Sequence, residues 1–164
     1  MAAPAGFRFE SPRPEDGAAI QRLVRESPPL DVNSTYAYLL LCRDFADTCV
    51  VARRDEGTLA GFVSAYLPPP RPQTLFVWQV AVAADCRGRG LAQAMIRHLL
   101  ARPRAAGVRR IETTVSPSNR PSRRMFAALA QELGAGCEEE TLFDAALFGD
   151  GAHEEETLLR IGAF

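Results

Sequence analysis

Lysine is absent from the 164-residue sequence, and all 19 basic residues are arginines. This absence excludes Schiff-base chemistry on a lysine and the lysine-containing phosphate loop of nucleotide hydrolases. The sequence also lacks an apolar run of roughly 18 residues, and its first ten residues carry no apolar signal core. We therefore expect neither a membrane-spanning nor a secreted protein.

The sequence has few histidines and no closely spaced cysteine pair. The two histidines are His98, which we expect to be structural, and His153. No CxxC pair occurs among the four cysteines, which are Cys42, Cys49, Cys86 and Cys137. We therefore expect no metal site and no disulfide framework, but reduced thiols in a cytoplasmic protein. A catalytic cysteine would need a neighbouring base, which the sequence does not reveal.

Composition indicates one folded domain over residues 1–164, with a flexible N-terminus at residues 1–6. Hydrophobic residues make up 47% and charged residues 24%, which excludes a disordered or fibrous chain. The net charge of -1 argues against nucleic-acid binding, but the charge is unevenly distributed. Residues 1–136 hold 18 arginines and 12 acidic residues, whereas residues 137–164 hold one arginine and 8 acidic residues. The chain could therefore bind an anion and a cation at different places.

The apolar periodicity predicts seven strands and four helices. Helices are expected from Pro14, after a cap within Asp31–Ser34, after Gly90 and after Asn119. Strands are expected near residues 7–10, 48–52, 59–66, 75–82, 108–115, 138–143 and 157–161. Hairpins alternate with helical crossovers in this order, which predicts an α+β fold with a mixed, mostly antiparallel sheet and helices on both faces.

A glycine-rich turn follows the most apolar strand and opens a helix. Its residues are Arg87, Gly88, Arg89, Gly90, Leu91 and Ala92. The first N–H groups of a helix lack intrahelical partners, and glycines let a pyrophosphate approach the backbone closely. Two alternatives remain at this stage. The turn could be a plain loop with exposed arginines, or a dinucleotide site with Gln93 in place of the last glycine and Glu112 as the ribose carboxylate.

The spacing Arg87-x-x-Gly90-x-Ala92 after an apolar strand resembles the acyl-CoA loop of the GNAT superfamily of N-acetyltransferases. The resemblance implies that backbone groups of Val80 and Val82 pair with the pantetheine arm of acetyl-CoA. It also implies that the Val80 N–H polarises the thioester carbonyl and that Asn119 faces the pantetheine amides. Asn119 can equally be a plain helix cap, and the two roles are compatible.

Further segments resemble one subfamily, the L-2,4-diaminobutyrate acetyltransferases of ectoine biosynthesis. They are Pro29–Ser34, Tyr38–Cys42, Thr48–Ala52, Gly61–Tyr66, Leu75–Val82, Glu112–Asn119 and His153–Glu156. The resemblance implies a homodimer that transfers acetyl from acetyl-CoA to the γ-amine of diaminobutyrate, a small diamino acid. A related enzyme acting on another small amine, and a non-catalytic module that senses CoA or a nucleotide, are the alternatives.

The same resemblance implies an acceptor site built from Asp31, Asn33, Trp78, His153 and Glu156. Carboxylates are natural partners for the two ammonium groups of the substrate. Taken alone, Asp31 suits a helix cap, Trp78 a core position and the 154–156 run a solvated surface. Regular strand alternation would place Trp78 on the same face as Val80.

The chemistry has one gap in this sequence. Many relatives protonate the leaving thiolate with a tyrosine on the helix after Asn119, but Met125-Phe126 occupies that region here. The general acid is therefore unassigned. Asp31, His153 and Glu156 are the candidates for proton transfer from the amine.

Overall fold

A computed structural model describes residues 3–151 and 153–164. Within these residues, one seven-stranded sheet has the order β1-β2-β3-β4-β5-β7-β6, and its only parallel pair is β4–β5. The strands are β1 (Phe7–Glu10), β2 (Val50–Arg54), β3 (Leu59–Tyr66), β4 (Thr74–Val82), β5 (Arg110–Val115), β6 (Cys137–Phe143) and β7 (Glu156–Gly162). The helices are α1 (Gly17–Arg25), α2 (Thr35–Asp44), α3 (Leu91–Leu100) and α4 (Arg120–Glu132). The predicted α+β class and the predicted order of elements are both confirmed.

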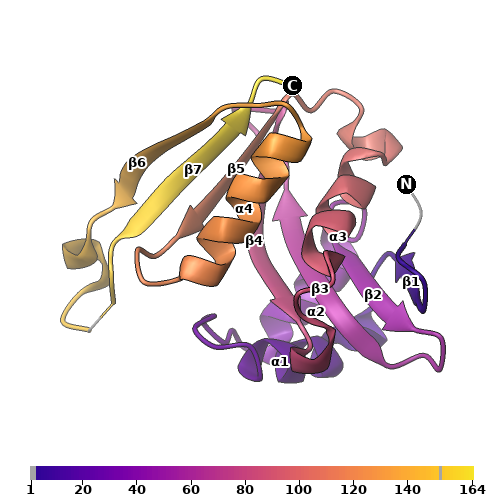
Figure 1. Ribbon diagram of the computed structural model, residues 1–164. Helices are drawn as coiled ribbons and strands as arrows, with labels where there is room; N and C mark the ends of the chain where they lie inside the picture. The colour runs from indigo at the N-terminus through magenta and orange to yellow at the C-terminus, as the bar shows by residue number, and fades with distance from the viewer. Residues whose placement is uncertain (1–2, 152) are drawn as a thin grey trace.

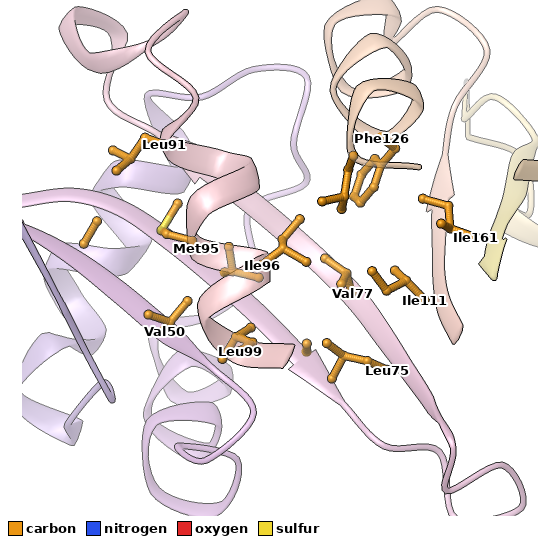
Figure 2. Packing of buried hydrophobic residues seen from close by; sticks show 14 of the residues in the cluster. Val50, Leu75, Val77, Leu91, Met95, Ile96, Leu99, Ile111, Phe126 and Ile161 are labelled. Carbon is orange, nitrogen blue, oxygen red and sulfur yellow. The ribbon is translucent and has the colours of Figure 1, made fainter. Parts of the chain in front are cut away.

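The helices cover both faces of the sheet (Figure 1), because each presents one apolar stripe to it. Helices α3 and α4 lie on one face, where Met95, Ile96 and Phe126 pack against strand residues such as Val77 (Figure 2). Helices α1 and α2 lie on the other face, over a second cluster that includes Tyr38, Phe62 and Ala81. Within the described residues, no helix has the length and apolar character to cross a membrane.

A β-bulge at Trp78 changes which side chains of β4 face each helical layer. The register with β3 pairs Ser64 with Gln79 but Ala65 with Val77, so Trp78 is the extra residue. Val77 and Val80 consequently both pack in the α3/α4 cluster, which a regular strand would not allow. Regular alternation, on which the prediction of one shared face for Trp78 and Val80 rested, is therefore interrupted at this point of β4.

Strands β4 and β5 separate part-way along the sheet. Among the described residues their pairing runs only from Thr74–Arg110 to Val77–Thr113, although β4 continues to Val82 and β5 to Val115. Figure 1 shows the two strands diverging beyond this point. The second half of β4 therefore lies at an open seam in the middle of the sheet.

Glu112, the residue that a dinucleotide site would need, is committed to ion pairs. Its side chain is 4% exposed and contacts Arg71 at 3.1 Å and Arg160 at 3.2 Å. Arg160 also reaches Glu140 on the edge strand β6, at 2.8 Å. A carboxylate held in this way inside the sheet has no access to a ribose, which removes the support for the dinucleotide alternative.

We expect Glu112→Ala to destabilise the fold by about 2 kcal/mol, because it leaves the half-buried Arg160 without its most buried partner. Urea unfolding monitored by circular dichroism measures the change. The control is Glu139→Ala, which removes an exposed partner of Arg123 and should cost less than about 0.5 kcal/mol. Equal losses in the two variants would contradict this view of Glu112.

Candidate active site

A hollow of about 540 Å³ opens where the seam between β4 and β5 meets the N-terminal ends of α3 and α4. Four segments contribute to its wall: the loop after α1, the second half of β4, the glycine-rich turn and the first turns of α4. Of the predicted cofactor residues, the hollow is lined by Val80, Val82, Arg87, Gly88, Gly90, Leu91, Ala92 and Asn119.

The glycine-rich turn has the backbone shape of an anion site. Gly88 and Gly90 both have φ of +71°, a left-handed conformation that side chains other than glycine rarely adopt. Gly90 is the N-cap of α3, and the first intrahelical bond runs from Ala94 N–H to Gly90 O at 3.0 Å. The N–H groups of the preceding first turn therefore point out of the helix at its positive end.

The two arginines of the turn have different surroundings. Arg87 lines the hollow, and its guanidinium donates to Val82 O at 3.0 Å and to Ser27 Oγ at 3.4 Å. Arg89 does not line the hollow. Its guanidinium lies 5.0 Å from the centre of the Phe7 ring, in a cation–π contact.

Backbone amides of β4 point into the seam at alternate residues. Gln79 N–H donates to Ser64 Oγ at 3.2 Å and Ala83 N–H to Ala60 O at 2.8 Å, so both face β3. Because backbone groups alternate along a strand, the N–H groups of Val80 and Val82 face away from β3, toward the gap left by β5. The bond from Arg87 to Val82 O agrees with this direction.

Asn119 combines the two roles considered for it. Its Oδ1 accepts from Ser122 N–H at 3.3 Å and so caps α4. The residue also lines both the large hollow and a smaller one beside it.

The smaller hollow has a volume of about 170 Å³ and shares Pro29, Leu30 and Asn119 with the larger one. Four of the five predicted acceptor residues line it: Asp31, Asn33, Trp78 and Glu156. Segments that are far apart in the sequence thus meet at one place, directly beside the open seam. The helix-cap interpretation of Asp31 is wrong, because Ser34 caps α2 by accepting from Ala37 N–H.

His153 joins the two carboxylates of the smaller hollow. Its Nε2 lies 3.2 Å from Asp31 Oδ2 and 3.9 Å from Glu156 Oε1. Its Nδ1 lies 2.6 Å from Glu154 O, and its ring stacks on Phe148 with centroids 3.9 Å apart. The bond to Glu154 O and the contacts with Asp31 and Glu156 raise the pKa of His153 above 6.5, since they favour the imidazolium.

Two of the four cysteines, Cys42 and Cys49, are too deeply buried to act as catalytic nucleophiles. All four cysteines are free, and burial raises the pKa of Cys42 to about 11 and that of Cys49 to about 12. Such thiols are poor nucleophiles near neutral pH. Among the described residues, no group of three metal-ligating side chains could hold a metal ion.

Comparison with known families assigns this arrangement. Residues 17–130 match the family model described as "Acetyltransferase (GNAT) family". The chain belongs to the GNAT acetyltransferase family. The large hollow is lined by Arg87, Gly90 and Ala92, the three residues whose spacing resembles the acyl-CoA loop of this family.

Closely similar relatives carry one name. The L-2,4-diaminobutyric acid acetyltransferase of Bordetella parapertussis is 55% identical over 96% of this chain and 85% of its own length. That of Streptomyces avermitilis is 52% identical over 97% of this chain and 89% of its own length. The structure of the Paenibacillus lautus diaminobutyrate acetyltransferase, in complex with diaminobutyric acid and coenzyme A, superposes with a TM-score of 0.92. It shares 44% identity and covers 96% of this chain and 95% of that one.

The sequence reasoning missed several residues that line the two hollows of this GNAT chain. Arg124 and Met125 line the large hollow from α4, and Gln79, Thr114 and Ser116 line the small one. Thr114 and Ser116 come after Thr113, the last residue of β5 that pairs with β4. Knowing where this pairing ends would have identified both residues as lining the small hollow. Phe126, in the region where many relatives carry a tyrosine, is buried in the core.

We expect proton NMR titration of His153 to give a pKa above 6.5, with a lower value in Asp31→Asn, because the neutral amide favours the imidazolium less. The charged contacts of His153 should stabilise the fold below pH 6.5 and lose this effect as the pH rises through the raised pKa. His98 provides the internal reference, because its ring packs edge-on against Phe9, away from Asp31. An unchanged His153 pKa in Asp31→Asn would contradict the described geometry.

Proposed function

We propose that this chain transfers the acetyl group of acetyl-CoA to the γ-amine of L-2,4-diaminobutyrate. In the reaction a C–N bond forms, the thioester C–S bond breaks, the amine loses a proton and the sulfur leaves as the thiol of CoA. One observation carries the proposal: a hollow at a helix N-terminus shares its wall with a small hollow bearing two carboxylates. Relatives about half identical in sequence, with the same name, support it.

The glycine-rich turn would bind the pyrophosphate of the cosubstrate. Backbone N–H groups of Gly88, Gly90 and the first turn of α3 supply donors, and Arg87 supplies a charge that one pyrophosphate would partly neutralise. Arg89 would contribute through its backbone, since its guanidinium lies over Phe7. The N–H and C=O groups of Val80 and Val82 at the seam would pair with the pantetheine arm, with Asn119 opposite them.

The Val80 N–H would act on the reacting carbonyl. A fixed backbone donor stabilises the negative charge that develops on the thioester oxygen when the amine attacks, at no cost of reorganisation. The bulge at Trp78 supports this role, because the extra residue determines which N–H groups of β4 after it face β3 and which face the seam.

Asp31 and Glu156 would bind the ammonium groups of the acceptor, with Asn33 and Trp78 as the remaining walls of the small hollow. Diaminobutyrate carries two ammonium groups, and selecting one for reaction requires the other to be anchored. The Asp31 side chain is 78% exposed and that of Glu156 is 20% exposed. The Glu156 carboxylate is therefore the one more shielded from competing water.

The amine must lose a proton before it can attack. Deprotonation of a lysine-like ammonium at pH 7 costs about 4–5 kcal/mol, since its pKa is about 10.4. The candidates for the proton acceptor are Asp31, Glu156 and His153. The contacts of His153 with Glu154 O, Asp31 and Glu156 raise its pKa and so favour its protonated form. A CoA thiolate is weakly basic and can leave without the missing tyrosine.

The product would be the precursor that a synthase cyclises to the osmolyte ectoine, as the subfamily resemblance implies. Four free thiols agree with a cytoplasmic location. The same resemblance implies a homodimer. Exposed Leu142, Phe143, Leu147 and Phe148 at and after the edge strand β6 support an interface, and sedimentation at the mass of a monomer would contradict it.

We expect purified protein to acetylate diaminobutyrate at the γ-amine, with kcat/KM at least about tenfold above that for ornithine, lysine or spermidine. The small hollow limits the distance between the two ammonium groups, which is the reason for the selectivity. Release of CoA measured with a thiol reagent, with product analysis by NMR, tests it. Equal rates on all four amines would favour an acetyltransferase of broader specificity, and CoA binding without turnover would favour a sensing module.

We expect Asp31→Asn and Glu156→Gln each to raise the KM for diaminobutyrate by about tenfold or more, with the KM for acetyl-CoA within twofold of wild type. Arg87→Ala should show the reverse pattern, because it removes charge from the pyrophosphate site. Initial rates with each substrate varied in turn provide the measurement. Normal acceptor KM values in both acidic variants would refute this placement of the acceptor site.

A further inference from the structure

A buried amide side chain connects β4 to the loop between α1 and α2. Gln79 is 4% exposed, and its Nε2 donates to the backbone oxygen of Asp31 at 2.7 Å. Its Oε1 accepts from the Tyr38 hydroxyl at 3.1 Å. Both polar ends of the amide are thus satisfied, as burial requires.

Tyr38 holds the next part of the same loop. This residue of α2 is fully buried, and its hydroxyl oxygen accepts from Asn33 N–H at 3.3 Å while its proton goes to Gln79. Gln21 of α1 adds a third tie, from its Nε2 to Asn33 O at 2.9 Å. Three side chains therefore hold the loop in place, because each makes a hydrogen bond to the backbone of Asp31 or Asn33.

These ties set the position of the acceptor carboxylate. The Asp31 side chain is largely exposed, and the contact described for it is with His153, which is itself at the surface. Its location thus depends on where the backbone of the loop is held. Gln79 fixes that backbone relative to β4, one residue before the Val80 N–H that we assigned to the thioester.

The bulge makes this link possible. Because Trp78 is the extra residue, Gln79 faces α2 while Val77 and Val80 face α3 and α4. In a regular strand Gln79 would share the face of Val77 and could not reach Tyr38. Ser64 stabilises the bulged conformation by accepting from Gln79 N–H.

We infer that Gln79 and Tyr38 are positioning residues that hold Asp31 at a fixed distance from the thioester-facing backbone of β4. Neither transfers a proton nor binds the cofactor. They set the separation between the anchor of one ammonium group and the site where the other amine reacts. This inference rests on the proposed function for its effect on acceptor use.

The test compares Gln79→Met, Tyr38→Phe and the double variant. Met keeps the approximate size of the side chain without the amide, and Phe removes only the hydroxyl. Each single variant should raise the KM for diaminobutyrate by about fivefold to tenfold and leave the KM for acetyl-CoA within twofold. Because both residues act through one network, the double variant should raise the acceptor KM no more than about twofold beyond Gln79→Met.

Thr48→Val is the matched control. The Thr48 hydroxyl is similarly buried and donates to Ala65 O at 2.6 Å, but it lies at the other end of α2. This variant should lower Tm by about as much as Tyr38→Phe and leave both KM values unchanged. If Gln79 and Tyr38 had a purely structural role, Gln79→Met and Tyr38→Phe would, like Thr48→Val, lower Tm and leave both KM values unchanged.

Hydrogen exchange of residues 27–34, measured without any acceptor, gives a readout that does not depend on the proposed activity. Exchange there should be faster in Gln79→Met and Tyr38→Phe and unchanged in Thr48→Val. If wild-type protein fails to acetylate diaminobutyrate, the proposed function fails while this readout still decides the positioning role. Unchanged loop exchange, or unchanged acceptor KM in both folded variants of an active enzyme, would overturn the inference.

Discussion

The site depends on the end of pairing between β4 and β5 after Val77. Two adjacent strands normally satisfy each other's backbone groups, and leaving such groups unpaired inside a fold is costly unless a ligand or water replaces the partner. Here the unpaired edge runs toward the N-terminus of α3, where further N–H groups lack intrahelical partners. An extended ligand with amide groups along one arm and a diphosphate at the end of that arm satisfies both sets of donors, and the pantetheine arm and diphosphate of acetyl-CoA have this shape.

The small hollow, which we propose as the acceptor site, also depends on the separation of β4 from β5. The space between β4 and β5 is lined by Trp78 and Thr114, and the loop after α1 closes it with Asp31. Two carboxylates brought close together repel each other, and the protonated form of His153, which lies within 4 Å of both, offsets this repulsion. An incoming ammonium group has the same sign of charge as His153 and can take over its contacts with the carboxylates.

Sequence reasoning predicted the order of elements, because this order depends on local patterns. Its candidate site residues also line the two hollows, except for Arg89 and His153. Apolar periodicity marks helices and strands, and glycines with arginines after a buried strand mark the anion-binding turn. It missed Gln79 and the bulge at Trp78, because a bulge depends on how two strands pair and leaves no local signal. The orientation of Arg89 toward Phe7 likewise depends on β1, which is distant in sequence. Long-range packing decides such details.

The size of the acceptor hollow bears on the class of amine that it can accept. About 170 Å³ corresponds to several water molecules at roughly 30 Å³ each, which suits a small amino acid better than a polypeptide side chain with its flanking backbone. In the proposed acceptor site, discrimination between amines would depend on the distance between charges, and the bond from Gln79 to Asp31 O would help to set that distance. On this proposal, selectivity for one amine of a small diamino acid would depend on buried neutral hydrogen bonds as much as on the exposed charges that would touch the substrate.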